Sequence, residues 1–162
     1  MAEATADTKT RALQDEKINV KFKLAVLWAS FMFLYIYVDY FALYMPGKIE
    51  DIQTGIVFEF NITQVFLLVA LVSVSIPALM IFISVALPAK VNRWVNIIIA
   101  MLYVPYSLFN LAGETWMHMM YGATVEVVLL ALVLWFAWKW PRTTESGTLS
   151  STPQSPATTL TE

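Results

Sequence analysis

Four stretches of the chain are almost wholly apolar, and each is long enough to cross a lipid bilayer as a helix. They lie at about residues 24–45, 62–87, 94–113 and 119–138. A helix rises 1.5 Å per residue and the hydrocarbon layer is about 30 Å thick, so roughly 20 apolar residues make one crossing. The stretches are apolar around their whole circumference, which is typical of helices in lipid. The sequence therefore predicts an all-α protein, an integral membrane four-helix bundle.

The composition agrees with a membrane protein and excludes several kinds of site. Residues of the AVILMFWYC set make up 59% of the chain and charged residues 14%, against about 45–50% apolar and about 25% charged in soluble domains. There is no cysteine and one histidine, so disulfide frameworks, thiol nucleophiles and Cys-ligated metals are excluded. We expect no metal and no cofactor. The net charge of −2 offers no basic field for nucleic acid, and the expected partner is the lipid bilayer.

The basic residues predict how the chain is oriented. In a four-span arrangement, nine of the ten Lys and Arg residues fall on one side and Lys48 falls on the other. Loops rich in Lys and Arg stay in the cytoplasm. We therefore expect a multi-pass protein of the cell membrane, plasma or inner, with both termini in the cytoplasm. The nine residues are Lys9, Arg11, Lys17, Lys21, Lys23, Lys90, Arg93, Lys139 and Arg142.

The two ends of the chain differ in composition from the apolar region between them. Residues 1–20 and 142–162 contain few large apolar side chains, so both are expected to be disordered cytoplasmic tails around a membrane domain at 21–141. In the one long loop, residues 48–52 fit a short surface helix and residues 56–60 an extended return. Asn61, with Gln64 three residues later, fits the cap of the second span.

Several strings in the chain resemble a family of small, uncharacterised, mostly bacterial four-span membrane proteins that is catalogued as a domain of unknown function. The resemblance covers about residues 20–141 and implies the same four-helix topology, but it brings no activity with it. The strings are Lys23-Leu24 with Leu27-Trp28, Tyr35-Ile36-Tyr37-Val38-Asp39, Ile62-Thr63-Gln64, Asn92-Arg93-Trp94-Val95-Asn96 and Trp135-Phe136-Ala137-Trp138-Lys139-Trp140-Pro141.

Two acidic residues lie inside the predicted spans. A charged carboxylate near the middle of a spanning helix costs about 2.5–3.5 kcal/mol on insertion scales. Asp39 lies about 9 Å below the outer end of the first span, and Glu126 about 10 Å below the outer start of the fourth, at 1.5 Å per residue. Because the two acids share one depth, they can face a common pocket that opens outward.

Polar side chains on the same spans fall at a similar depth. Tyr35 is one helical turn from Asp39, so its hydroxyl can donate to that carboxylate. Tyr106, Ser107 and Asn110 belong to a polar stripe on the third span. Together with the two acids, these residues are the predicted site for a ligand or proton. We predict no catalytic residue and no metal ligand.

The chain places no basic residue at this depth. Two acids in apolar surroundings can exchange a proton or cation, or hold a cationic ligand against tyrosine rings. The leading hypothesis is therefore a transporter, channel-like unit or sensor that binds or conducts a proton, a cation or a small cationic or polar ligand. A structural interpretation is also open. In it, Asp39 forms a hydrogen bond to a neighbouring helix and so helps the helices to assemble, and the Glu126 side chain extends to the outer lipid headgroups.

Two further hypotheses belong to different classes. In one, the chain is a non-catalytic accessory or assembly subunit whose polar groups specify helix packing with a membrane partner. In the other, it is an intramembrane enzyme that uses the paired carboxylates, although no nucleophile motif or phosphate-binding glycine loop is present; we expect no enzyme. Four membrane spans are few to enclose a transport path for an ion or ligand, so a homo-oligomer, such as a dimer, is also expected.

Overall fold

The computed structural model describes residues 17–57 and 60–141. Residues 1–16, 58–59 and 142–162 lie outside the described part, and with them most of the predicted N-terminal tail and the whole C-terminal tail. The described part contains five helices and one two-stranded antiparallel sheet. The mainly helical fold that the sequence predicts is therefore confirmed.

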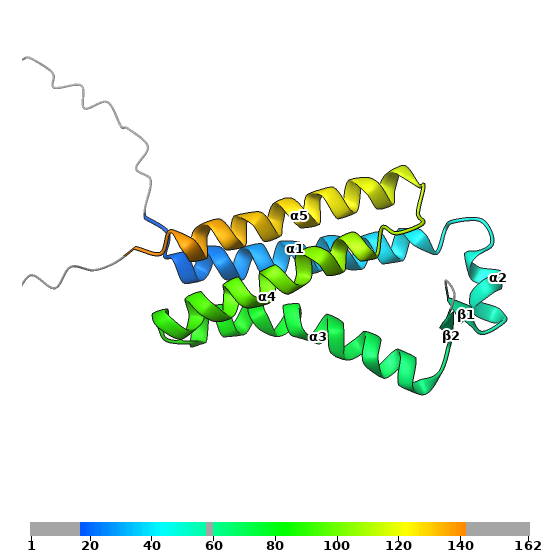
Figure 1. Cartoon of the computed structure of the whole chain (residues 1–162), viewed down its shortest axis with the longest axis horizontal. Coiled ribbons are helices and arrows are strands. Elements are labelled where there is room, and N and C mark those ends of the chain that lie inside the picture. Colours follow the sequence, from blue (N-terminus) through cyan, green and yellow to red (C-terminus); the bar gives the residue numbers. More distant parts are fainter. Residues whose placement is uncertain (1–16, 58–59, 142–162) are drawn as a thin grey trace, which may run out of the picture.

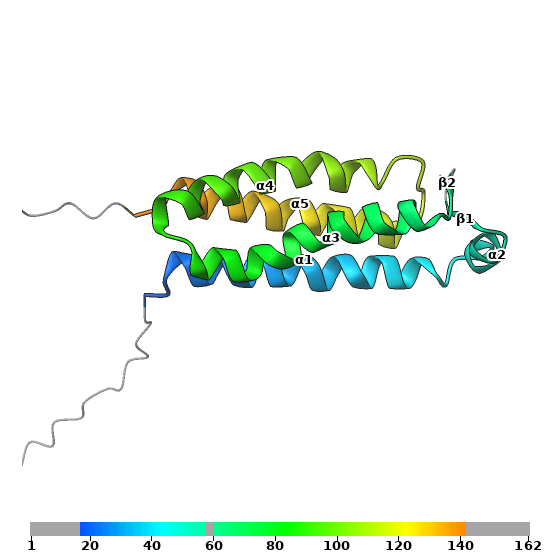
Figure 2. The same ribbon diagram turned by 90° about the horizontal axis from the view of Figure 1, so that it is seen from below.

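Four of the helices are long and run side by side along the long axis of the molecule (Figures 1 and 2). They are α1 (Val20–Ala42), α3 (Gln64–Ala86), α4 (Ala89–Phe109) and α5 (Met117–Trp138). Helix α5 packs against both α1 and α4, whereas α3 packs mainly against α1. The N-terminal part of α3 leaves the other helices (Figure 1), so one end of the bundle is built by α1, α4 and α5.

A small folded loop joins α1 to α3. It contains α2 (Lys48–Gln53) and a hairpin of β1 (Ile56–Val57) and β2 (Phe60–Asn61). The short helix that the sequence predicts here is thus confirmed. The predicted cap of α3 is wrong: the Thr63 hydroxyl accepts a bond from the Phe66 N–H at 3.1 Å. Asn61 cannot serve as that cap because it is paired with Ile56 in the hairpin.

Three helices of the described part, α1, α3 and α5, are long and apolar enough to cross a membrane. Large apolar side chains cover the exposed side of α3, among them Val65, Leu68 and Phe82. A soluble protein rarely exposes so much continuous apolar surface, and the three helices therefore indicate a membrane protein. Helix α4 is less apolar than the other three, because polar and basic residues occupy its first two turns.

The helix bounds differ from the predicted spans by a few residues. Helix α1 ends at Ala42, before Met45, and α4 begins at Ala89, five residues before Trp94. The predicted spans contain apolar residues almost exclusively. A helix, however, continues through charged residues as long as its backbone hydrogen bonds are formed. Helix α4 ends with Asn110 as its C-cap, and the chain then turns through Gly113 at φ 84°.

Charge is divided between the two ends of the bundle. The basic end is where α1 and α4 begin and α3 and α5 end (Figures 1 and 2). The acidic end is the opposite one, and it holds every described acid together with Lys48. The described basic residues other than Lys48 are Lys17, Lys21, Lys23, Lys90, Arg93 and Lys139, and all of them lie at or next to the basic end.

Large aromatic side chains fill the centre between α1 and α4. The ring of Trp28 meets those of Phe31 and Tyr103 edge to face, with centroids 5.9 and 6.4 Å apart. All three residues are buried, together with Leu130 and Val133 of α5. Because α1 and α4 are bridged by side chains of this size, they need not touch along their backbones, and space remains between them toward the acidic end.

Candidate functional site

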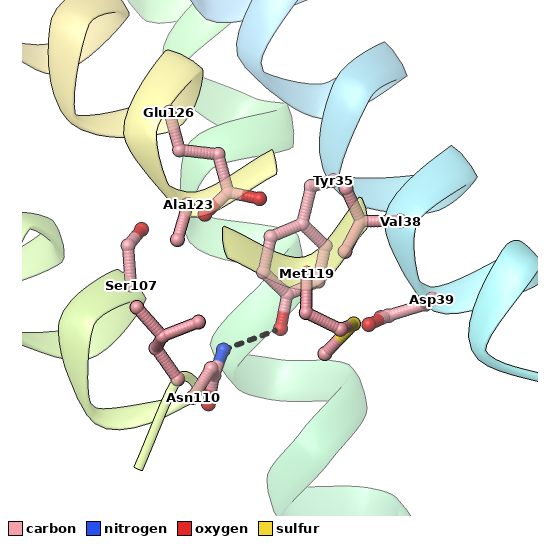
Figure 3. A pocket seen from close by; sticks show the side chains of 9 residues that line it. Tyr35, Val38, Asp39, Ser107, Asn110, Met119, Ala123 and Glu126 are labelled. Carbon is pink, nitrogen blue, oxygen red and sulfur yellow. Dashed lines mark hydrogen bonds between the residues drawn. The ribbon is translucent and has the colours of Figure 1, made fainter. Parts of the chain in front are cut away.

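A pocket lies at the acidic end between α1, α4 and α5 (Figure 3). It receives Asp39 from α1 and Glu126 from α5, so the two acids predicted to face one cavity do line the same one. The space open to the centre of a water molecule is about 20 Å³, which is room for about one water molecule. The lining residues are Tyr35, Val38, Asp39, Ser107, Asn110, Leu111, Met119, Ala123 and Glu126.

The two acids have different surroundings. Glu126 is buried, with 4% of its surface exposed, whereas Asp39 is exposed at the edge of the pocket. The Ser107 hydroxyl is the polar neighbour of the Glu126 carboxyl, and no ion pair reaches either acid within residues 17–57 and 60–141. The pocket thus joins an exposed carboxyl to a buried one, with no cation from the described chain between them.

Ser107 adds a hydroxyl to the same pocket. It lies on α4, is 1% exposed and lines the cavity beside Glu126 (Figure 3). Its Oγ interacts with the Glu126 carboxyl, but within the described part of the chain it makes no hydrogen bond of full geometry. Burying a hydroxyl without such a bond costs about 1–3 kcal/mol. A water molecule or ion in the pocket would complete its hydrogen bonding.

Tyr35 and Asn110 are bonded to each other and not to the acids. The Asn110 side-chain amide donates to the Tyr35 hydroxyl at 3.3 Å (Figure 3). The hydroxyls of Tyr35 and Tyr106 are also 3.3 Å apart. The expected bond from Tyr35 to Asp39 is therefore wrong, because the tyrosine ring turns inward and stacks on Tyr106. Tyr106 lies behind Tyr35 and is not part of the pocket lining.

The hydroxyls of Tyr35 and Tyr106 are followed by that of Ser73 on α3, one turn before Pro77. Ser73 Oγ lies 3.3 Å from the Tyr106 hydroxyl, and Tyr103 donates to the Ser73 carbonyl. That carbonyl is available because Pro77, four residues later, has no N–H to bond it. Ser73 therefore links α3 to α4, and Tyr103 satisfies the carbonyl that the proline leaves free.

Gly122 explains how α1 and α5 come close enough to share the pocket. A Cβ atom added at Gly122 would overlap the side chain of Val38. Val38 adjoins Asp39, and Glu126 is one turn beyond Gly122 on α5. The missing side chain lets α1 and α5 come into close contact here, so the two acids lie on helices that touch.

Sequence reasoning missed a second polar cluster, which lies toward the basic end. Asn96 accepts bonds from the Trp28 indole at 2.7 Å and from Ser84 at 3.2 Å, and its amide donates to the Asn92 side chain at 2.6 Å. Asn92 donates in turn to the Ser84 carbonyl. All four residues are completely buried. The four-residue spacing of the two asparagines was the available signal, since it places both on one helix face.

An ion pair ties the two loops of the acidic end together. Lys48 Nζ lies 3.4 Å from Glu114 Oε1, so the start of α2 is joined to the loop between α4 and α5. Glu114 is four residues before His118, but two such side chains are too few to hold a metal ion. Within the described ranges, no group of three or more His, Cys, Asp or Glu side chains could hold a metal ion.

Comparison with known families gives one match. The model of DUF6326, a family of unknown function, matches residues 13–147, which is most of the chain. The chain belongs to this family. No curated protein and no solved structure matches it. The DUF6326 match agrees with the resemblance to an uncharacterised family found in the sequence. It assigns no activity, and the functional argument rests on the pocket.

Proposed function

We propose that the chain is a four-span protein of the cell membrane whose acidic-end pocket binds or conducts a proton or a small cation. The observation that carries this proposal is the meeting of Asp39 and Glu126 in one pocket without a basic partner from the described residues. An exposed acid attracts a cation, and a buried acid holds it where water is scarce. Polar groups inside a membrane are costly, and in such proteins they mark ion or proton pathways.

The size of the pocket favours a proton or a small ion over an organic ligand. Its volume of about 20 Å³ is far below the roughly 300–1,000 Å³ of sites that bind drug-sized ligands. A proton, or a single ion held by carboxyl and hydroxyl oxygens, fits this space. Glu126 and Ser107 supply such oxygens from facing helices. A larger cationic or polar ligand would require the helices to separate.

The fourth span in this proposal is α4. Its polar residues Asn92 and Asn96 face inward and are fully bonded there, so they do not oppose insertion as exposed amides would. Its outward residues include Ile98, Met101 and Leu102, which are exposed and apolar. Mean hydropathy counts all residues alike, whereas lipid meets only the outward ones.

The proposed orientation places the basic end in the cytoplasm. Six described basic residues gather there, and positively charged flanks resist translocation. Both termini then lie in the cytoplasm. The pocket lies in the half of the bundle that faces outward. Asp39 and Glu126 would therefore meet their proton or cation from the extracytoplasmic side.

A flux measurement tests the pocket. The purified chain is reconstituted into vesicles with a pH-sensitive or cation-sensitive dye inside, and a gradient is imposed. Wild-type protein is expected to carry flux, and Glu126→Gln to lose roughly tenfold or more, since bonds to a charged group contribute about 1.5–3 kcal/mol. Asp39→Asn is expected to lower the rate less, because Asp39 lies at the exposed edge.

The matched control is Glu50→Gln, the same substitution at an exposed acid of α2 outside the pocket. It is expected to retain wild-type flux. Equal flux in wild-type and Glu126→Gln vesicles, with both proteins folded and inserted, would refute the pocket as the site.

The second candidate is an accessory subunit or homodimer, and one observation favours it. Helix α3 contacts α1 and only weakly α4, so much of its surface has no helix against it. Cross-linking in membranes separates this role from the first. If Asp39→Asn and Glu126→Gln abolish oligomers while flux is absent from the wild type, the polar groups serve assembly.

A further inference from the structure

Cation and aromatic side chains are stacked on one another at the basic end. The guanidinium carbon of Arg93 lies 6.0 Å from the ring centroid of Trp94 and 5.8 Å from that of Trp138. Lys139 Nζ lies 3.8 Å above the ring of Trp135. Arg93 and Trp94 are on α4, whereas Trp135 and Trp138 are on α5. The contact between Arg93 and Trp138 therefore crosses the junction of the two helices, whereas the other two contacts lie within one helix or at its C-cap.

Arg93 has a buried donor with no acceptor. Its Nε is inaccessible to water and has no hydrogen-bond partner within residues 17–57 and 60–141. No carboxylate of the described chain can supply one, because all described acids lie at the opposite end. The guanidinium is a planar fork of five donors that matches the oxygens of a phosphate. An anionic oxygen is the partner that suits this guanidinium, and because Nε is covered, the oxygen would reach Nε only when the side chains around it move.

The surroundings of Arg93 indicate which anion is presented to it. Trp94 and Trp138 are 53% and 67% exposed, and they lie in the second turn of α4 and at the last residue of α5. Exposed tryptophans at such positions lie at the level of lipid headgroups. A phospholipid offers its phosphate at this level while its acyl chains lie along the apolar helix surfaces. Phosphate dissolved in water would gain nothing from these rings.

We propose that the junction of α4 and α5 at the basic end binds the headgroup of an anionic phospholipid. Arg93 donates to the phosphate, Trp94 and Trp138 hold the guanidinium in place, and Lys139 adds positive charge beside it. This inference rests on the membrane part of the proposed function and is independent of the acidic pocket.

The test measures lipid retained by the full-length protein in detergent, by native mass spectrometry. The probes are phosphatidylglycerol and the zwitterionic phosphatidylcholine of the same chain length. Wild-type protein is expected to retain phosphatidylglycerol preferentially. Arg93→Lys keeps the charge but removes the Nε–H fork, and it is expected to lower that preference about fivefold, the equivalent of about 1 kcal/mol.

The control is Lys90→Gln, which removes an exposed charge one turn earlier on α4 and is expected to have a smaller effect than Arg93→Lys. Trp138→Leu tests the site without changing any charge and is expected to act like Arg93→Lys. Equal retention of the two lipids by the wild type would overturn the proposal, as would unchanged preference in both Arg93→Lys and Trp138→Leu. Displacement of phosphatidylglycerol by inorganic phosphate alone would also overturn it.

The two proposals fail separately. Glu126→Gln is expected to retain phosphatidylglycerol as the wild type does, since the pocket lies at the other end of the bundle. Loss of flux in that variant with unchanged lipid preference supports both proposals. Wild-type vesicles without flux, but with the same lipid preference, would remove the pocket function and leave the headgroup site in place.

Discussion

Buried polar side chains serve two purposes in this chain, and their bonding distinguishes them. Asn92 and Asn96 use their amides fully, on each other, on Trp28 and on Ser84. Ser107 is almost equally buried, but within the described residues it has only the Glu126 carboxyl beside it and no hydrogen bond of full geometry. A satisfied buried network stabilises one packing arrangement, whereas an unsatisfied group retains affinity for a ligand. The asparagine cluster is thus structural, and the pocket is the candidate site.

The first residue-scale prediction concerns Asn96. Asn96→Ala removes the partner of the Trp28 indole, of the Ser84 hydroxyl and of the Asn92 side-chain oxygen, and it is expected to lower the free energy of unfolding by about 1–3 kcal/mol. Reversible unfolding in mixed micelles measures this. Asn61→Ala, at an exposed asparagine of the hairpin, is the control and is expected to change it by less than about 0.5 kcal/mol. Equal effects of the two substitutions would contradict a structural role for the cluster.

The sequence predicts the site better than the bonds within it. Depth along each helix is set by counting residues, so the shared level of Asp39 and Glu126 follows from position, whereas their meeting also depends on the contact between α1 and α5. The partner of Tyr35 depends on its rotamer and on the position of α4, and neither is visible in the sequence. The apolar part of the lining, such as Met119 and Ala123, was missed because such residues are equally common in cores and on lipid-facing surfaces.

At the scale of helices, the contact between α1 and α5 depends on a residue without a side chain. Exchanging glycine for alanine inside a helix normally stabilises it by about 0.8–1.0 kcal/mol. At Gly122 the added Cβ would overlap Val38, and overpacking typically costs about 1–3 kcal/mol. The two effects have opposite signs, so the outcome reveals which one dominates.

We predict that Gly122→Ala lowers the free energy of unfolding and that Val38→Ala added to it restores part of the loss. The double-mutant cycle measures the coupling between the two positions. A gain in stability from Gly122→Ala would contradict the packing described here, because it would mean that the helices are not in close contact at this point.

Apolar patterning located all four long helices but misplaced some of their ends. Helix ends depend on caps, such as Thr63 for α3, and on turns, such as Gly113 after α4. Hydropathy does not record these features. The mean hydropathy of α4 is lowered by two asparagines that face inward, Asn92 and Asn96.

At the scale of the whole molecule, the division of charge is the organising feature. Described acids lie at one end, and described basic residues other than Lys48 lie at or next to the other. This arrangement suits a bundle that crosses a membrane, with the acidic pocket facing outward and the headgroup site facing the cytoplasm. Both proposals therefore depend on four crossings in this orientation.

Single-cysteine labelling tests that central claim directly, because the chain contains no cysteine of its own. Cysteine is introduced at Gln53, Ala89 or Thr115, three exposed positions in α2, at the start of α4 and in the loop before α5. In intact cells an impermeant maleimide is expected to label Gln53→Cys and Thr115→Cys but to reach Ala89→Cys only after the membrane is opened. Labelling of Ala89→Cys and Thr115→Cys from the same side would contradict the account, because α4 would then not cross the membrane.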